Sequence, residues 1–177
     1  QPGLLGGPLY ALHKTAGACG MAAVVTERTG VPCVPMYWMH GEDSDFAEVR
    51  GASVVDAQFV VHEHALPETL HREGGLVGDL PLAAVDAVTR EALAHTAGLP
   101  AHAELLALWD RACARAGDLG EAVNALLLAL FAESGLVVID PRLPAFRAAA
   151  RPILDRYLAE APALEQAARQ AGAWLES

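Results

Sequence analysis

A glycine-rich segment that leads into a helix is the first part of the sequence with residues suited to ligand binding. It runs GLLGGPLY over residues 3–10, and Lys14, the single lysine of the chain, follows four residues after Tyr10. Glycines let a ligand approach the backbone, and a helix start offers free N–H groups and a positive dipole end to a phosphate or carboxylate. Tyr10 and Lys14 share a helix face and lean back toward the loop. The segment is therefore a candidate anion site, and the alternative is a structural turn with a surface Tyr–Lys pair.

An acidic loop is the second candidate. Residues 38–46 read WMHGEDSDF, which brings His40 together with Glu42, Asp43 and Asp45 after a predicted strand. In open α/β sheets, ligands bind at the carboxyl ends of the strands. Carboxylates and an imidazole there could hold Mg²⁺, receive a substrate amine or act as a general base. The alternative is a solvated acidic loop with one helix cap.

Other polar residues are weaker candidates. Asp140 follows a predicted strand but precedes a proline, which favours a cap or turn. His62 and His64 lie on one face of a predicted strand, as a metal pair could, but no third ligand is evident and an ordinary strand edge is favoured. His13 borders the apolar face of the first helix and is interpreted as a packing residue. No partner pattern marks His71, His95 or His102.

Hydrophobic periodicity predicts the elements that must position the two candidate segments. A helix is predicted over residues 9–28, ending near Gly30. Its predicted buried face consists of Leu9, Leu12, Ala16, Cys19 and Ala23. Residues 31–39 are predicted as a buried strand, although Pro32 and Pro35 count against a central strand.

The remainder of the chain alternates between strands and helices, apart from a predicted loop at residues 66–81. The predicted strands cover 53–64 and 136–140, and the predicted helices cover 82–96, 101–116, 121–133, 145–159 and 163–176. This alternation predicts an α/β fold with a parallel sheet. Residues 82–134 would then be a mainly helical insertion or a layer over the sheet.

The composition excludes several classes of function. The 177 residues have a net charge of −10 and a pI of about 5.0, which argues against a nucleic-acid-binding surface. A hydrophobic content of 53% excludes intrinsic disorder, and the longest apolar run, residues 125–132, is too short to span a bilayer. No secretory signal opens the sequence, and Cys19, Cys33 and Cys113 are widely spaced and odd in number. We therefore expect a cytoplasmic protein with buried, reduced thiols, no bound metal and no membrane or nucleic-acid partner.

The two candidate segments, in this order and spacing, resemble the bacillithiol biosynthesis cysteine-adding enzyme family. That family has a GLFGGPLYT-type segment followed by a lysine, then a VPVFW strand and an SEDHDF-type loop. The matching parts here are GLLGGPLY at 3–10, Lys14, VPMYW at 34–38, EDSDFAEV at 42–49 and GLVVIDPR at 135–142. The resemblance covers nearly all of this chain, but only the N-terminal part of the family's full chain.

The resemblance implies a fold and a reaction. The fold would be a Rossmann-like core similar to that of class I aminoacyl-tRNA synthetases, with a C-terminal coiled coil that forms a homodimer in the full-length family. The reaction would join cysteine to glucosaminyl-malate, the last step in the synthesis of the low-molecular-weight thiol bacillithiol. A synthetase-like fold suggests ATP, although no ATP-specific motif is present in the sequence.

The resemblance also implies roles for residues around one pocket. The predicted substrate-binding residues are Gly6, Gly7, Tyr10, Trp38 and Asp45, and the predicted catalytic residues are Lys14, Asp43 and Glu42, with His40 as a candidate in place of the family's histidine. The helix start and Lys14 would bind the malate carboxylates, and the acidic residues would bind the amine. A local positive field allows a chain of negative net charge to bind an anionic ligand.

The sequence departs from the family pattern in ways that keep a second interpretation open. The family's loop histidine is Ser44 here, and His40 is a candidate replacement. No strand precedes the glycine-rich segment, and the second Rossmann half and the coiled coil are not within the sequence, so we expect the front portion of a larger enzyme. The alternative is a non-catalytic or degenerate domain that binds a carboxylate, sugar or nucleotide.

Overall fold

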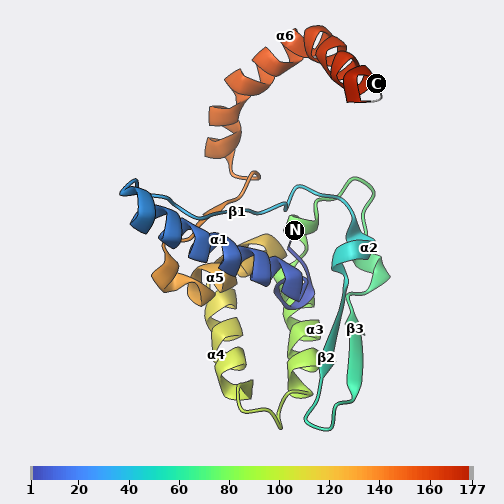
Figure 1. Cartoon of the computed structure of the whole chain (residues 1–177). Helices are drawn as coiled ribbons and strands as arrows, with labels where there is room; N and C mark the ends of the chain where they lie inside the picture. The colour runs from blue at the N-terminus through green and yellow to red at the C-terminus, as the bar shows by residue number, and fades with distance from the viewer. Residues whose placement is uncertain (1, 176–177) are drawn as a thin grey trace. The chain divides into compact units, whose positions relative to one another are not determined.

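The structure is a computed structural model that describes residues 2–175. The chain divides into two units, residues 1–141 and residues 142–177, which are taken separately below (Figure 1). The first unit contains both candidate segments. It is a mixed α/β unit, as the sequence predicts.

The strands β1 (Met36–Trp38) and β4 (Val137–Ile139) form a two-stranded parallel sheet in which Tyr37 pairs with Val138. Tyr37 and Val138 pack against the hydrophobic core. A strand within the predicted range 31–39 is confirmed only over Met36–Trp38, and the prediction that it is buried is wrong, because Met36 and Trp38 are exposed. The N–H of Val137 donates to the carbonyl of Pro35, so the proline closes the strand pair without needing the N–H that it lacks.

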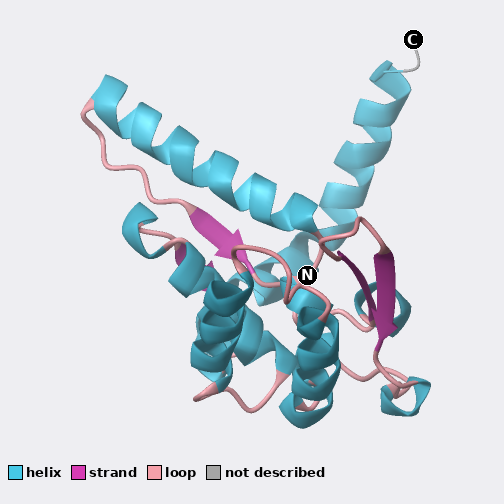
Figure 2. Ribbon diagram, turned by 90° about the horizontal axis from the view of Figure 1, so that it is seen from below, coloured by secondary structure: helices cyan, strands magenta, loops and turns pink. Residues whose placement is uncertain are grey.

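The helix α1 (Leu9–Thr29) follows Pro8 and lies beside β1 in both ribbon views (Figure 1, Figure 2). Gly30 ends it in the left-handed conformation at φ 70°, and its N–H donates to the carbonyl of Thr26. This is the common glycine cap of helices, and it confirms the predicted end of the helix.

The buried face of α1 differs from the predicted one. Leu12 and Cys19 pack against the core, as predicted. The prediction is wrong for the other three residues of the face, since Leu9, Ala16 and Ala23 are all exposed. Thr15 and Ala22 are buried in their place. Thr15 can be buried because its hydroxyl donates to the carbonyl of Ala11 at 2.8 Å, which satisfies its polar group within the helix.

A β-hairpin replaces the single strand predicted at residues 53–64. The strands β2 (Gly51–Val55) and β3 (Val61–Ala65) pair antiparallel. Asp56 makes the turn between them, because its Oδ1 accepts from the N–H groups of Gln58 at 2.8 Å and Val60 at 2.9 Å. Phe59 has a positive φ of 63°, which reverses the chain without a glycine. The prediction of one strand is therefore wrong.

We expect replacement of Asp56 by asparagine to destabilise this hairpin at neutral pH. The hydrogen bond with His62 and then those from Val60 and Gln58 lower the pKa of Asp56 below its ordinary value of 3.8. The ionised carboxylate therefore contributes stability above pH 3.8, and that contribution is lost as the pH falls through the lowered pKa. Urea denaturation of the wild type and of Asp56→Asn, measured from pH 7 down to pH values below 3.8, gives the free energy of unfolding of each protein. The difference between the two free energies should be largest near pH 7 and should shrink in acid. An equal difference at every pH would contradict the assigned role of the charge.

Three helices, α3 (Leu82–Ala94), α4 (His102–Cys113) and α5 (Leu119–Leu130), pack together and confirm the helices predicted in this region (Figure 1). The helix α5 contacts α3, α4 and β4, and it also contacts the N-terminal loop. Asp118 starts α5 by accepting from the N–H of Glu121 at 2.8 Å. The face of α5 that carries Leu119, Ala122, Val123 and Leu127 is fully buried.

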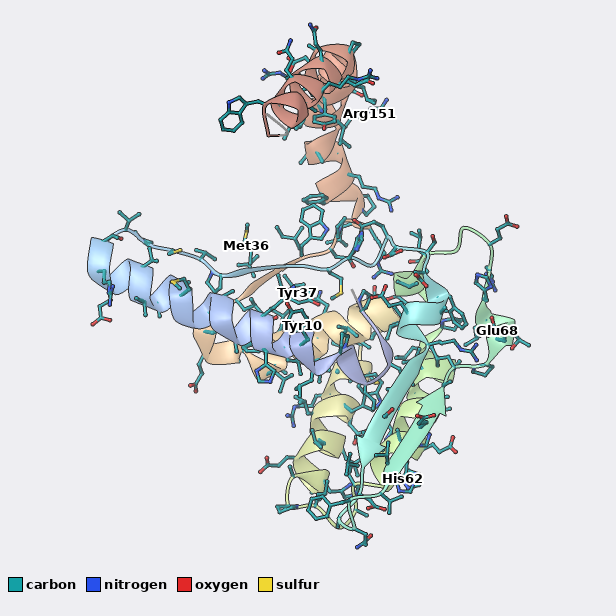
Figure 3. All side chains as sticks on the ribbon, turned by 45° about the vertical axis from the view of Figure 1, so that its right-hand side comes forward. Tyr10, Met36, Tyr37, His62, Glu68 and Arg151 are labelled. Carbon is teal, nitrogen blue, oxygen red and sulfur yellow. The ribbon has the colours of Figure 1, made fainter. Side chains whose placement is uncertain are left out.

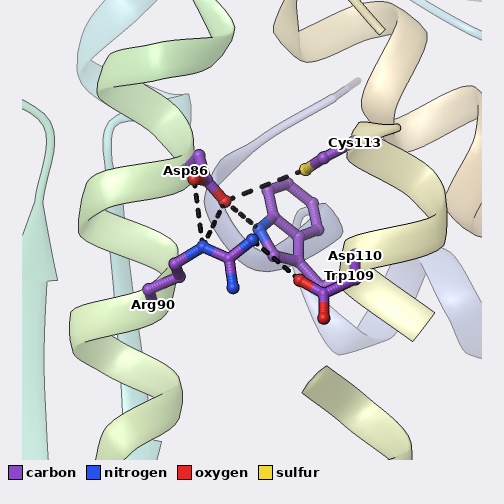
Figure 4. A network of polar contacts seen from close by, with 5 residues as sticks. All are labelled: Asp86, Arg90, Trp109, Asp110 and Cys113. Atoms are coloured by element: carbon purple, nitrogen blue, oxygen red, sulfur yellow. Dashed lines mark hydrogen bonds and ion pairs between the residues drawn. The ribbon is translucent and has the colours of Figure 1, made fainter. Parts of the chain in front are cut away.

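A polar network joins α3 to α4 around the buried indole of Trp109 (Figure 4). Trp109 Nε1 donates to Asp86 Oδ1 at 2.8 Å. Arg90 bonds Asp86 through Nε at 3.0 Å and reaches Asp110 across the interface at 2.7 Å. Every polar group of the indole is therefore satisfied, which allows a large apolar ring to be buried beside charges.

The second unit contains α6 (Pro144–Leu175), a single helix. The prediction of two helices separated near Pro162 is wrong, because the helix continues through both Pro152 and Pro162. Exposed ion pairs four residues apart support it, and they join Arg151 to Asp155, Arg156 to Glu160 and Arg169 to Glu165. Across residues 2–175, no helix is both long enough and apolar enough to cross a membrane.

Candidate functional site

A pocket of about 930 Å³ lies at the N-terminal end of α1. Its walls come from the loop before α1, the first three turns of α1, the strands β1 and β2, and the one-turn helix α2 (Phe46–Val49). Of the residues predicted from the sequence, the pocket brings together Gly7, Tyr10, Lys14 and Trp38. The predicted anion site and the predicted strand therefore meet at one cavity.

The glycines shape the loop that forms one wall of this pocket. The loop includes the 3₁₀ turn η1 (Leu4–Gly6), after which Gly7 has φ 89° and ψ −174°. The N–H of Gly6 donates to Gly3 and that of Gly7 to Leu4, at 3.0 and 3.1 Å. Gly6 points away from the cavity, since a Cβ there would lie 2.8 Å from Leu126 of α5. Gly7 lines the pocket and Gly6 supports the loop from behind.

Lys14 supplies the positive charge of the pocket. Its Nζ lies 4.3 Å from the centre of the Tyr10 ring, a cation–π contact between neighbours one turn apart on α1. Both side chains are exposed and line the pocket. Within residues 2–175, no carboxylate forms an ion pair with Lys14, so its ammonium group is available to an anionic ligand.

The wall opposite α1 is β1. Tyr37 lies on this strand across from Tyr10 of α1 (Figure 3), and both residues line the pocket. Burial raises the pKa of Tyr37 above its ordinary value of 10.0, so its phenol stays protonated at neutral pH. Tyr37 is thus a neutral hydrogen-bond donor at the cavity, and Trp38 adds an exposed aromatic surface.

Two carboxylates of the acidic loop, those of Asp43 and Asp45, accept hydrogen bonds from backbone N–H groups close to them in the sequence. Asp43 Oδ1 accepts from the N–H groups of Ser44 at 2.7 Å and Asp45 at 3.1 Å. These bonds, that from Asp45 first, lower the pKa of Asp43. Asp45 accepts from the N–H of Glu48 at 3.1 Å and caps α2. Asp45 is therefore the helix cap that the sequence allowed as an alternative.

His40, Glu42, Asp43 and Asp45 do not line the pocket. His40 Nδ1 lies 3.6 Å from Asp43 Oδ2, and Glu42 Oε2 is buried without a hydrogen-bond partner. The carbonyl of Asp43 accepts from the N–H of Val77, which ties this loop to the segment before α3. The catalytic roles implied for these residues stay predictions.

Among the polar residues that line the pocket, the sequence did not single out Thr15, Tyr37, Glu48 and Ser53. A signal for Glu48 was present. Asp45 and Glu48 form a D-x-x-E pattern, which marks the start of a helix and places an acidic residue in its first turn. The predicted elements include no helix at 46–49, so the sequence prediction does not place Glu48 at the site.

Three of the weaker histidine candidates lie together. His62 and His64 share the inner face of β3, as predicted, and His95 supplies the neighbour that the sequence did not reveal. The His62 and His95 rings stack at 3.7 Å, and His62 Nε2 lies 2.8 Å from Asp56. Among residues 2–175 no cluster of His, Cys, Asp and Glu has metal-binding geometry.

Other histidines contact single neighbours. His71 stacks on Phe46 at 5.5 Å, and His102 Nδ1 lies 2.9 Å from the hydroxyl of Thr96. His13 is exposed, so its interpretation as a packing residue is wrong.

Asp140 is buried at the end of β4.

The three cysteines are free, as predicted, but they differ in environment. Cys19 and Cys113 are partly buried, whereas Cys33 is exposed, so the prediction of a buried thiol is wrong for Cys33. Burial, and then the charge of Asp86, raises the pKa of Cys113 to about 11, which keeps it a protonated and unreactive thiol.

Comparison with known proteins agrees with the resemblance seen in the sequence. Residues 1–177 match the family described as "Bacillithiol biosynthesis BshC, N-terminal Rossmann-like domain". The chain is 34% identical to a protein of Solibacter usitatus named "Putative cysteine ligase BshC", over 93% of this chain and 30% of that protein. Proteins of the same name from Salinibacter ruber and Geobacillus thermodenitrificans are 35% and 32% identical, over 88% and 90% of this chain.

The chain spans about 30% of the length of these relatives. The match covers residues 1–177, so the loop before α1, α1, β1, α2 and β2, which line the pocket, all lie within it. The chain belongs to the BshC family of bacillithiol biosynthesis, within its N-terminal Rossmann-like domain.

Proposed function

We propose that the full-length protein containing this chain is a ligase that joins cysteine to glucosaminyl-malate, and that the pocket at the start of α1 binds part of its substrate. The observation that carries the proposal is Lys14. It stands at the lysine position of the family motif, it lines the pocket, and no described carboxylate neutralises it. The names of the relatives, cysteine ligases, support the reaction.

The pocket suits recognition of a substrate better than activation of a carboxyl group. Lys14 can pair with a carboxylate of malate, and Tyr37 can donate a hydrogen bond from its protonated phenol. Tyr10 and Trp38 offer aromatic surfaces to a sugar ring. Each of these groups is held by α1 or β1, so the walls are in place before the ligand arrives.

The glycine-rich loop, as the structure describes it, does not present Gly6 and Gly7 as a cradle for the phosphates of ATP. A glycine-rich phosphate loop presents its backbone N–H groups to the phosphates, but the N–H groups of Gly6 and Gly7 donate to carbonyls of their own loop. Amide formation requires an activated carboxyl group, and we propose that its activation uses residues outside this chain. A core similar to that of class I synthetases, homodimer formation and a cytoplasmic location remain part of the proposal for the full-length protein.

Replacing Lys14 by methionine in the full-length protein should lower kcat/KM for glucosaminyl-malate by roughly 10- to 100-fold, because a charge-assisted hydrogen bond of about 1.5–3 kcal/mol is lost. The assay supplies glucosaminyl-malate, cysteine and ATP and measures bacillithiol formation. His13→Ala is the matched control, since His13 is the exposed neighbour of Lys14 on α1 and does not line the pocket. Unchanged activity in Lys14→Met would refute the assignment of the site.

Two observations favour a second function. Ser44 replaces the family's loop histidine, and no described acid or base of that loop lines the pocket. A non-catalytic domain that binds a carboxylate or sugar fits these facts. Thiol profiling of a deletion strain separates the two functions, because loss of bacillithiol with accumulation of glucosaminyl-malate supports the ligase, and unchanged thiols support the binding domain.

A further inference from the structure

The pocket contains one positive and one negative side chain. Of the described residues that line it, Lys14 and Glu48 are the charged ones, and they come from different elements, α1 and α2. Both side chains are exposed, and neither forms an ion pair with a residue of the described chain. Two opposite charges left uncompensated in one cavity match a ligand that carries both charges.

The local structure of α2 leaves the Glu48 carboxylate free. At the third position of a helix that begins D-x-x-E, a glutamate ordinarily reaches back to the N–H of the capping residue. Here the N–H of Asp45 donates instead to Asp43 Oδ1 at 3.1 Å. Asp43 thus replaces the side chain of Glu48 in the cap, and Glu48 is available to the pocket.

The nearest basic residue in the sequence does not neutralise Glu48 either. Arg50 follows two residues later, and its guanidinium pairs with Glu68. The ring of Phe46 also lies 5.6 Å from this guanidinium. Arg50 is therefore engaged on the side of α2 that carries Phe46, which is buried and does not line the pocket.

We infer that Glu48 is the specificity-determining residue that binds the ammonium group of a ligand whose carboxylate pairs with Lys14. The inference rests on the proposed function for the position of the site and for the ligand, and it adds the residue that recognises the ligand's amine. It also moves the amine subsite from the acidic loop at 42–45 to α2.

Binding measurements on the full-length protein test this assignment with two probes. Glucosaminyl-malate carries the ammonium group and the carboxylates, and its N-acetylated form keeps the carboxylates without the ammonium charge. Glu48→Gln should weaken binding of glucosaminyl-malate by roughly 10- to 100-fold and leave binding of the N-acetylated form unchanged. Lys14→Met should weaken binding of both compounds.

Matched controls separate charge recognition from folding. Glu63→Gln removes an exposed carboxylate from β3, outside the pocket, and should change neither affinity. The melting temperature of Glu48→Gln should equal that of the wild type, because the side chain of Glu48 bonds to no described residue.

The outcomes test separately the role of Glu48 in binding the amine and the proposed ligase function. Unchanged affinities in Glu48→Gln, beside lost turnover in Lys14→Met, would overturn the role of Glu48 and retain the proposed function. The expected selective loss, in a protein that forms no bacillithiol, would support Glu48 and overturn the ligase. A wild-type protein that binds neither compound would overturn both.

Discussion

Replacing Leu127 by alanine should lower the free energy of unfolding of the first unit by about 2–5 kcal/mol, because a buried cavity is left where the side chain was. Leu127 is 1% exposed and lies on α5, the helix that contacts α3, α4, β4 and the N-terminal loop. Total stabilities of about 5–15 kcal/mol are usual for domains, so this loss is a large share. The unfolding midpoint in urea measures it.

Leu128 is the matched control for this prediction. It is the next residue of the same helix and is 43% exposed, so Leu128→Ala removes the same atoms from a much less enclosed position. We expect a change within roughly 0.5 kcal/mol of wild type for that variant, as is usual at surface positions. Equal losses at the two positions would show that α5 does not bury the face assigned to it.

Replacing Gly7 by alanine should cost about 1–3 kcal/mol of stability and displace the loop that walls the pocket. Gly7 has φ 89° and ψ −174°, a conformation that in practice only glycine adopts. Since a wall displaced by about 1 Å can lower turnover by roughly 100-fold, the full-length variant should also lose activity. Thermal denaturation and the bacillithiol assay measure the two effects.

Gly20 tests whether the conformation at Gly7, rather than any added methyl group, is responsible. Gly20 lies inside α1, is exposed, and a Cβ there would meet no atom within 4 Å. Gly20→Ala should therefore stabilise the protein by roughly 0.5–1 kcal/mol through helix propensity. A Gly7→Ala protein as stable and active as this control would contradict the strain assigned to the loop.

The helices were predictable from the sequence because their signals are local. Periodic apolar residues define α3, α4 and α5, and Gly30 marks the end of α1 in the sequence itself. The β2–β3 hairpin was not predictable in this way, because its turn contains neither glycine nor proline. The turn depends on Asp56 bonding two later N–H groups and on a positive φ at Phe59, and alternating residues on both sides resemble a single strand.

The site was also predictable only where its signal is local in the sequence. The pairing of Tyr10 and Lys14 follows from helical spacing alone, and the structure places both at the pocket. Which acidic residue faces that pocket depends on one turn of helix. Asp45 caps α2, and Glu48, three residues later in the same helical turn, lines the pocket. A helix of four residues is too short to give a periodic signal in the sequence.

The pairing of β1 with β4 determines when the pocket can form as the protein is made. All of the residues that line the pocket lie between positions 2 and 53, yet the parallel partner of Met36 is Val137, about 100 residues later. A ribosome that adds about 5–20 residues per second leaves β1 without that partner for on the order of 5–20 s. Closing so long a loop also carries an entropic cost that only the later helices can offset. The pocket at the start of α1, though its lining residues all lie at the front of the chain, is therefore expected to be among the last parts of this unit to become rigid.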